Sequence, residues 1–260
     1  MKNSDEQFYY EITEKEHIWK GEGIQYLINF IRGKALKGHF RVLEIGCGIA
    51  GVVPYLPANV EYVGTDVSDF ALARARNMYP EASVNFINAS ADALPFKDSS
   101  FDLVLAFNVI EHCRQPKVVL NEVLRVIRSG GSGFFTGPNL DFPFSLPNGV
   151  RHRGGLYKTG LVIVRIFDYI LRIFGYFKFR TIPINFTEAT GRFEKPDDDL
   201  RYLCSSYEII EYLKRKGAKI GYINPFIEGR GLMVKFKKII TNIPAMRYYG
   251  RPLTFMFQKM

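Results

Sequence analysis

The stretch VLEIGCGIAG, residues 42–51, joins an apolar run to the glycine pattern Gly46-x-Gly48-x-x-Gly51. Glycines at this spacing are typical of a tight turn between a buried strand and a helix, where the backbone can come close to a ligand. This feature restricts the fold to the α/β class with a nucleotide-type site. It leaves open whether the ligand carries a pyrophosphate. The glycines shape the turn in the same way in a site for a dinucleotide and in a site for a ligand without a pyrophosphate.

The first half of the chain alternates short apolar runs with helical stretches, which predicts a doubly wound, mostly parallel sheet. Ligands of such sheets bind at the carboxyl ends of the strands, near the switch in strand order. Later segments predict a helix at 205–216 and strands at 219–227 and 252–258. In the first half, strands are predicted at 41–45, 60–65, 84–88, 101–107 and 133–136, and helices at 69–78 and 115–127.

Length and cysteine content place the chain among ordinary globular proteins. At 260 residues it is long enough for one large domain with a well-buried core. The first twenty residues have no apolar segment behind a basic start, so we expect no secretory signal and a cytoplasmic location. Three scattered cysteines are too few for a disulfide framework or a cysteine-rich zinc site: Cys47, Cys113 and Cys204.

Positive charge is concentrated in the second half of the chain. Residues 1–138 carry 14 Lys and Arg against 16 Asp and Glu, whereas residues 139–260 carry 21 against 10, a net charge of +11. Basic blocks lie at 151–153, 214–216 and 235–238. They can face anionic lipid, nucleic acid or an acidic substrate, or they can be solvated helix faces.

An insertion interrupts the alternation between residues 139 and 200, and its centre, 159–180, is strongly apolar. Arg165, Asp168 and Arg172 interrupt this run, so it is a poor transmembrane span. Their i, i+3, i+7 spacing places all three on one face of an amphipathic helix. Three interpretations remain open: a helix docked on the core, a lid over an apolar substrate, and a helix lying on a membrane surface.

We expect a single domain with four segments: an N-terminal helical cover (1–40), a cofactor-binding core (41–138), a helical insertion or substrate lid (139–200) and the C-terminal part of the sheet (201–260). Residues 7–34 read as helical. Four side chains there can either cover the cleft or pack the helix down: Tyr9, Tyr10, His17 and Trp19.

Three acidic side chains follow successive predicted strands. Glu44 lies two residues before Gly46, where a carboxylate would repel a pyrophosphate but attract a cation such as an ammonium or sulfonium group. Asp66 can accept hydrogen bonds from both hydroxyls of a ribose, and Asp92, with the amide of Ala93, can contact an adenine. Taken singly, each acid has another interpretation: Glu44 can be a solvated residue at a strand end, Asp66 can form a turn, and Asp92 can cap a helix.

Several stretches together resemble the successive motifs of the class I S-adenosylmethionine-dependent methyltransferases: VLEIGCGIAG, YVGTD, ASADALPFKDSSFDLVLAFNVIEH and LNEVLRVIRSGGSGFF. The resemblance covers residues 40–138. It implies a Rossmann-like sheet of about seven strands with an antiparallel last strand. It also implies that Glu44, Gly46 and Gly48 hold the methionine portion of the cofactor. The full implied cofactor-binding set is Glu44, Gly46, Cys47, Gly48, Asp66, Val67, Asp92, Ala93 and Asn108.

The run NVIEHC is similar to a segment of ubiquinone-pathway O-methyltransferases, in which a Glu-His pair lies at the mouth of the active site and can help to bind a divalent metal. Here Asn108 replaces a second acid three residues before Glu111, so we expect no metal site. His112 can instead act as a general base, because histidine titrates near neutral pH. Alternatively, Glu111 and His112 begin the helix that precedes Gln115.

These features predict an S-adenosyl-L-methionine-dependent methyltransferase with Glu111 and His112 as catalytic residues and S-adenosyl-L-homocysteine as product. The apolar, basic second half favours a small acceptor of lipidic, aromatic or glycolipid-like character and a peripheral contact with an anionic membrane. No Asn-Pro-Pro-Tyr type run follows the fourth predicted strand, which disfavours nucleic-acid amino-methyltransferases. The alternatives are an RNA methyltransferase, a cofactor-binding protein without catalysis and a nicotinamide oxidoreductase.

Overall fold

The computed structural model describes residues 21–81, 83–146, 150, 153–181, 202–203, 205–224, 231–243, 248, 250–251 and 253–260. The predicted N-terminal cover lies outside the described residues up to position 20, and with it the four aromatic and histidine side chains assigned to it. Cys204 and residues 182–200 of the insertion also lie outside them.

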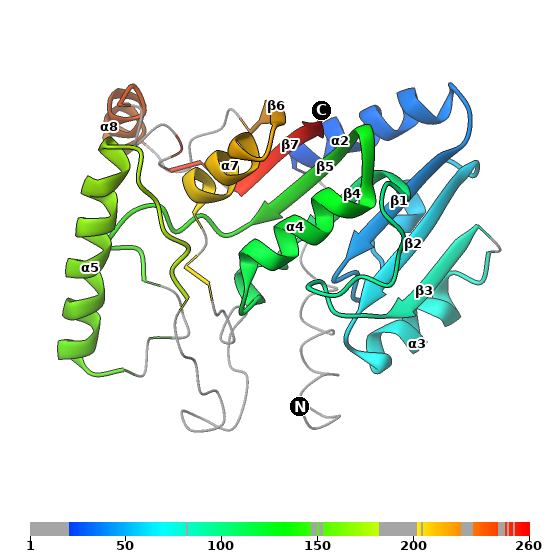
Figure 1. Ribbon diagram of the computed structural model, residues 1–260, viewed down its shortest axis with the longest axis horizontal. Coiled ribbons are helices and arrows are strands. Elements are labelled where there is room, and N and C mark those ends of the chain that lie inside the picture. The colour runs from blue at the N-terminus through cyan, green and yellow to red at the C-terminus, as the bar shows by residue number, and fades with distance from the viewer. Residues whose placement is uncertain are drawn as a thin grey trace.

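Within the described residues, seven strands form one sheet in the order β3-β2-β1-β4-β5-β7-β6 (Figure 1). The first five strands are parallel, and β7 runs antiparallel to both of its neighbours, β5 and β6. This confirms the predicted doubly wound sheet with an antiparallel last strand. The strands are β1 (Phe40–Ile45), β2 (Val60–Asp66), β3 (Val84–Asn88), β4 (Phe101–Phe107), β5 (Ile127–Gly137), β6 (Ala218–Ile223) and β7 (Leu253–Lys259).

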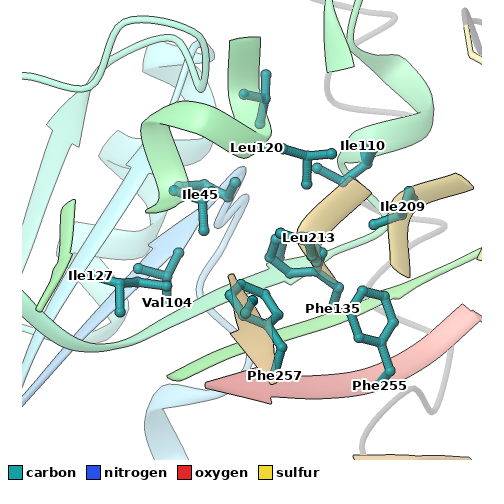
Figure 2. Close-up of a cluster of buried hydrophobic side chains, with 14 of the residues drawn as sticks. Ile45, Val104, Ile110, Leu120, Ile127, Phe135, Ile209, Leu213, Phe255 and Phe257 are labelled. Carbon is teal, nitrogen blue, oxygen red and sulfur yellow. The ribbon is translucent and has the colours of Figure 1, made fainter. Parts of the chain in front are cut away.

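Helices cover both faces of the sheet because the strands bury side chains on both sides. Two apolar cores result: helices α4 and α7 cover one face, and α2 and α3 cover the other. Figure 2 shows the first core, where Leu120 and Leu213 from the helices meet Phe135 and Phe257 from the strands. The α-helices are α2 (Glu22–Ala35), α3 (Asp69–Met78), α4 (Pro116–Val126), α5 (Gly155–Ile173), α7 (Ser206–Arg215) and α8 (Leu232–Ile240).

Predicted boundaries differ from the structure at two strands: the strand predicted at 219–227 ends at Ile223, before the described Asn224, and the strand predicted at 133–136 begins earlier. Strand β5 begins at Ile127 rather than at residue 133, because the chain pairs with Phe101 as soon as α4 ends and then passes an irregularity in the register. Helix α5 occupies Gly155–Ile173 rather than 159–180. It ends because Gly175 has a φ of 77°, and its amide and that of Tyr176 donate to the carbonyls of Arg172 and Leu171, the pattern of a Schellman cap.

The switch in strand order lies between β1 and β4, which run parallel side by side while the chain leaves them in opposite directions. The carboxyl ends of β1, β2 and β4 therefore meet at one edge of the sheet. In a sheet of this kind, that edge is where a ligand binds.

Candidate active site

The glycine turn after β1 is shaped by its neighbours. Gly46 and Gly48 have φ values of 61° and 51°, a region that favours glycine. A β-carbon at Gly46 would lie 2.5 Å from Cγ2 of Val109, which follows β4. The amide of Cys47 donates to the carbonyl of Thr65 at 2.9 Å, and this bond fixes the turn against β2. Neither glycine can be replaced without strain or rearrangement.

No α-helix follows this turn in residues 46–59, all of which the structure describes, although the glycine pattern is typical of a turn between a strand and a helix. The chain forms only a three-residue 3-10 helix there, η2 (Val53–Tyr55). A pyrophosphate site of the dinucleotide type relies on the amides and the dipole of a helix that begins at the turn. The turn therefore lacks the helix amides and the helix dipole that stabilise a diphosphate.

Glu44 is buried at the end of β1, so the interpretation of a solvated strand end is wrong. Its carboxyl group accepts a hydrogen bond from the hydroxyl of Tyr62 on β2. Burial raises the pKa of Glu44 to about 8, and the charge of Asp66 adds to this effect, while the Tyr62 bond opposes it. In the protein without a ligand, this carboxyl group is therefore protonated at neutral pH.

Asp66 is buried at the end of β2, one position beyond the pairing of Ile45 with Thr65. Its Oδ2 accepts a hydrogen bond from the amide of Gly48 at 2.8 Å, and its Oδ1 accepts one from the amide of Ser68 at 2.9 Å. The second bond forms a turn within the chain, as one alternative predicted. The first ties Asp66 to the glycine turn, so the acid of β2 and the glycines of β1 form one unit.

Cys47 has its thiol packed over Gly64, where an added β-carbon would lie 2.8 Å from the sulfur. The pKa of this thiol is raised by burial and by the charges of Glu44 and Asp66. The thiol is therefore a protonated packing group, whereas the backbone of Cys47 belongs to the turn.

The third group of predicted cofactor residues lies on the surface next to this edge. Val67 is 68% exposed, and Asp92 and Ala93 are exposed as well. The hydroxyl of Ser90 donates to Asp92 at 2.5 Å. No helix begins at Asp92 in the described residues around it, so the helix-cap interpretation is wrong. An exposed carboxylate and an exposed apolar side chain at this edge of the sheet are suited to contacts with an adenine ring.

Asn108 and the Glu-His pair follow β4. Asn108 is exposed, has a φ of 53°, and donates its amide to the carbonyl of Thr136 at 3.0 Å. Glu111 and His112 form a separate 3-10 helix, η3 (Ile110–His112), and α4 begins only at Pro116. The pair therefore lies in a short helix of its own before Gln115, and this helix is not continuous with α4.

The side chain of Glu111 is buried beside the end of β5, where a β-carbon at Gly137 would lie 3.1 Å from its Oε2. His112 is half-buried. Burial raises the pKa of Cys113 to about 12, with further contributions from the charges of Glu111 and Asp92. Both acids therefore lie close enough to Cys113 to influence it, which brings the Glu-His turn near the predicted adenine-binding residues.

Sequence reasoning missed two parts of this region. Tyr62 reads as an ordinary strand residue, although the two-residue period of a strand would place it near Glu44. The second missed part is a buried polar cluster that anchors the insertion: Arg172 donates to Asp141 at 3.1 Å and to Glu208 at 3.0 Å. Among the residues that the structure describes, no group of three His, Cys, Asp or Glu side chains is arranged to hold a metal ion.

Comparison with known proteins identifies the fold. The seven-stranded sheet with an antiparallel β7 is a Rossmann-like fold shared with solved S-adenosylmethionine-dependent methyltransferases. A methyltransferase of this kind from Mesorhizobium loti superposes over 92% of this chain and 99% of its own, with a TM-score of 0.55 and 17% identity. The [4+2]-cyclase SpnF superposes over 93% of this chain and 86% of its own, with a TM-score of 0.51 and 17% identity.

Residues 43–135 match the family model described as a methyltransferase domain. A fatty-acid O-methyltransferase of Mycolicibacterium smegmatis is 37% identical over 110 residues, 40% of this chain and 39% of that protein. A phthiotriol/phenolphthiotriol dimycocerosates methyltransferase of Mycobacterium ulcerans is 34% identical over 100 residues, 37% of this chain and 36% of that protein. The chain thus spans less than half the length of these curated relatives.

Proposed function

We propose that this protein transfers the methyl group of S-adenosyl-L-methionine to a small organic acceptor of lipidic character. The observation that carries the proposal is the unit formed by the glycine turn, Glu44 and Asp66 at the switch in strand order. Two buried carboxyl groups and a turn without a following helix disfavour a diphosphate and favour a cationic ligand with a ribose.

The residues present fit this cofactor. Without a side chain at Gly46, the turn packs closely against Val109 and keeps its shape at the end of β1. Glu44 would bind the ammonium group and Asp66 the ribose hydroxyls, while Asp92 and Val67 would border the adenine. When bound, the cofactor supplies an activated methyl group on a sulfonium, so that little covalent chemistry is left to the protein.

We assign the remaining work to alignment, exclusion of water and, for acceptors with a proton to lose, removal of that proton. His112 would take the proton, and Glu111 would hold η3 in place from its buried position against the end of β5. The insertion, residues 139–200, would close over the acceptor. We keep the four segments of the single domain as part of this proposal.

A lipidic acceptor is supported by two independent observations. The described part of the insertion presents apolar side chains to solvent on α5. In addition, the two relatives named above are, by their names, methyltransferases of fatty acids and of dimycocerosates. An acceptor of this kind would be presented at a lipid surface, which agrees with the expected peripheral membrane contact.

The test is transfer of radioactive methyl from S-adenosylmethionine to long-chain fatty acids and long-chain phenols, with short-chain homologues and RNA as comparison acceptors. We expect label in the long-chain products and its loss in Asp66→Ala. Glu61→Gln, on the same strand but paired with Arg41 at its amino end, serves as the control and should retain activity. Label in none of the acceptors, with cofactor affinity intact, would favour the cofactor-binding protein without catalysis.

RNA methylation is the second candidate, because the +11 second half can contact phosphates. Label in RNA but in no lipid would support it, and binding to RNA would then weaken steeply as salt rises. The fold alone does not decide the reaction, since the superposed SpnF is titled a cyclase.

A further inference from the structure

Helix α5 buries its charged face and exposes its apolar face, which is the reverse of an ordinary surface helix. Its two arginines, Arg165 and Arg172, are buried. Arg172 pairs with Asp141 and Glu208, and Arg165 donates to the backbone carbonyls of residues 140, 142 and 145. The other two charged residues of the helix lie on the same half-buried or buried face, and one of them, Asp168, pairs with Arg180. The charged face of α5 is therefore the docked face.

The outer face of α5 is apolar and exposed. Leu156, Ile163, Phe167, Ile170 and Phe174 follow one another at i, i+7, i+11, i+14 and i+18, which places them on one side of the helix. Leu156 is 91% exposed, and Ile163 and Phe167 are about 60% exposed. Soluble monomers rarely expose contiguous apolar patches of this kind unless the patch binds something. In Figure 1, α5 stands at the left edge of the molecule, with no labelled element beyond it.

Helix α8 carries a second exposed apolar stripe. Leu232, Phe236 and Ile239 lie at i, i+4 and i+7 and are all exposed. Two lysines border this stripe and are exposed as well: Lys235 and Lys238. The combination of an apolar face with flanking lysines is typical of helices that lie in the interface of an anionic membrane.

A series of contacts places α8 near the C-terminal end of α5. The hydroxyl of Tyr207 donates to the carbonyl of Arg172 at 3.3 Å, and the Tyr207 ring lies 6.4 Å from that of Tyr248. Two residues later, Gly250 lies under the side chain of Lys237 from α8. Figure 1 shows α8 at the upper end of α5, in agreement with these contacts. The two stripes therefore belong to one region of the molecule.

We propose that the outer faces of α5 and α8 bind the surface of an anionic lipid bilayer. The lysines of α8 would contact lipid headgroups, and the aromatic and aliphatic side chains would enter the boundary of the acyl chains. A second copy of the chain is a poorer occupant, because pairing through this face would bring two basic regions of like charge together. Within the described residues, no helix combines the length and hydropathy that spanning a bilayer requires.

This docking surface goes beyond the methyl-transfer proposal and is independent of the cofactor site. The insertion begins directly after Gly137, at the carboxyl end of β5, on the edge of the sheet where the cofactor residues lie. A lipid acceptor taken from a bilayer bound to α5 would therefore approach the edge of the sheet at which the proposed cofactor residues lie.

The test is co-sedimentation of the full chain with phosphatidylcholine vesicles that contain or lack phosphatidylglycerol, at low and high salt and without acceptor or cofactor. We expect binding to the anionic vesicles at low salt and its decrease at high salt. Phe167→Ser should weaken binding about tenfold, because it removes a large apolar side chain from the interface. Lys235→Glu with Lys238→Glu should also weaken it by about tenfold or more.

Matched controls carry the same changes elsewhere on the surface. Leu36→Ser alters an apolar residue that is 88% exposed at the end of α2, and Lys37→Glu alters an exposed lysine beside it. Both should bind vesicles as the unchanged protein does. Absence of binding by the unchanged protein, or equal losses in controls and test variants, would overturn the proposal. A dimer that Phe167→Ser dissociates in the absence of lipid would assign the face to a second copy and overturn it as well.

Affinity for S-adenosylhomocysteine, measured by calorimetry on the same variants, separates this proposal from the proposed function. We expect that affinity to be unchanged in Phe167→Ser and in the double lysine variant. Loss of vesicle binding with intact cofactor affinity would show that the docking surface and the cofactor site are separate.

Discussion

Cofactor binding should be coupled to the release of one proton from Glu44. The pKa of this buried carboxyl group is about 8 in the protein without a ligand, so the group is protonated at neutral pH. The ammonium group of the cofactor needs the ionised form. Binding must therefore remove a proton, and affinity should rise with pH for as long as Glu44 is protonated in the free protein and ionised in the complex.

The magnitude follows from the pKa. Each pH unit below about 8 costs about 1.4 kcal/mol to ionise the group, which corresponds to about a tenfold change in affinity. Between pH 6 and pH 7 we therefore expect affinity for S-adenosylhomocysteine to rise about tenfold, with release of about 0.9 proton at pH 7. This window lies below the pKa typical of α-amino groups, about 7.7–8.0, so the ligand remains cationic.

Isothermal titration calorimetry in buffers of different ionisation enthalpy measures both quantities. Glu44→Gln removes the titrating group, although its amide carbonyl can still accept the hydrogen bond from Tyr62. We expect the variant to bind with a flat pH profile and without proton release, and to approach the unchanged protein towards acid pH. Glu61→Gln, which alters a half-buried acid paired with Arg41 on the neighbouring strand, is the matched control.

Two results would refute this reasoning. A flat profile without proton release in the unchanged protein would show that Glu44 does not ionise on binding. The same slope in Glu44→Gln would assign the proton to another group, such as His112.

The carboxyl group of Glu44 also affects the pH dependence of stability. Because its folded pKa lies above the unfolded value of 4.5, its contribution to stability is lost as pH rises from about 4.5 through about 8. Thermal denaturation of Glu44→Gln should therefore show its largest relative gain above pH 8.

Three further predictions concern the same region. Tyr62→Phe removes a bond that lowers the pKa of the carboxyl group beside it, so the rise in cofactor affinity should move to higher pH in the same calorimetric series. Gly46→Ala should weaken cofactor binding by about 1–3 kcal/mol through backbone strain and the contact with Val109, and adding Val109→Ala should restore only the steric part. Arg172→Met leaves two buried acids without their cation and should lower the free energy of unfolding by about 3–5 kcal/mol in urea denaturation, whereas Asp168→Asn, in a more exposed pair, should cost about 1 kcal/mol or less.

The sheet could be predicted from the sequence because its strands carry a strong local signal. Strands β1, β2 and β4 are buried along almost their whole length, so each reads as a mostly apolar run of six or seven residues. The positions of Glu44 and Asp66 at neighbouring strand ends follow from this pattern. Strand β5 was predicted too short, because the glycines and polar residues at 128–131 resemble a turn although they extend the strand.

The orientation of α5 could not be predicted in the same way. Periodicity shows that Arg165, Asp168 and Arg172 share a face, but it does not show whether that face is docked or exposed. The partners that decide the matter are distant in sequence: Asp141 lies 31 residues before Arg172, and Glu208 lies 36 residues after it. The segment after the glycine turn is a second feature that the sequence does not reveal. The glycine pattern is present, but no α-helix follows it in residues 46–59.

Tyr202 links α5 to the turn that contains Glu111 and His112, through its backbone amide at one end and its side-chain hydroxyl at the other. Its amide donates to the carbonyl of Glu111 at 2.8 Å, and its hydroxyl donates to Glu208 at 2.7 Å, which in turn pairs with Arg172 of α5. A displacement of α5 therefore either carries the Glu-His turn with it or breaks one of these buried bonds. If the proposed function holds, an acceptor that displaced α5 would also shift Glu111 and His112, so that acceptor binding and alignment of the proposed base would be coupled through Tyr202.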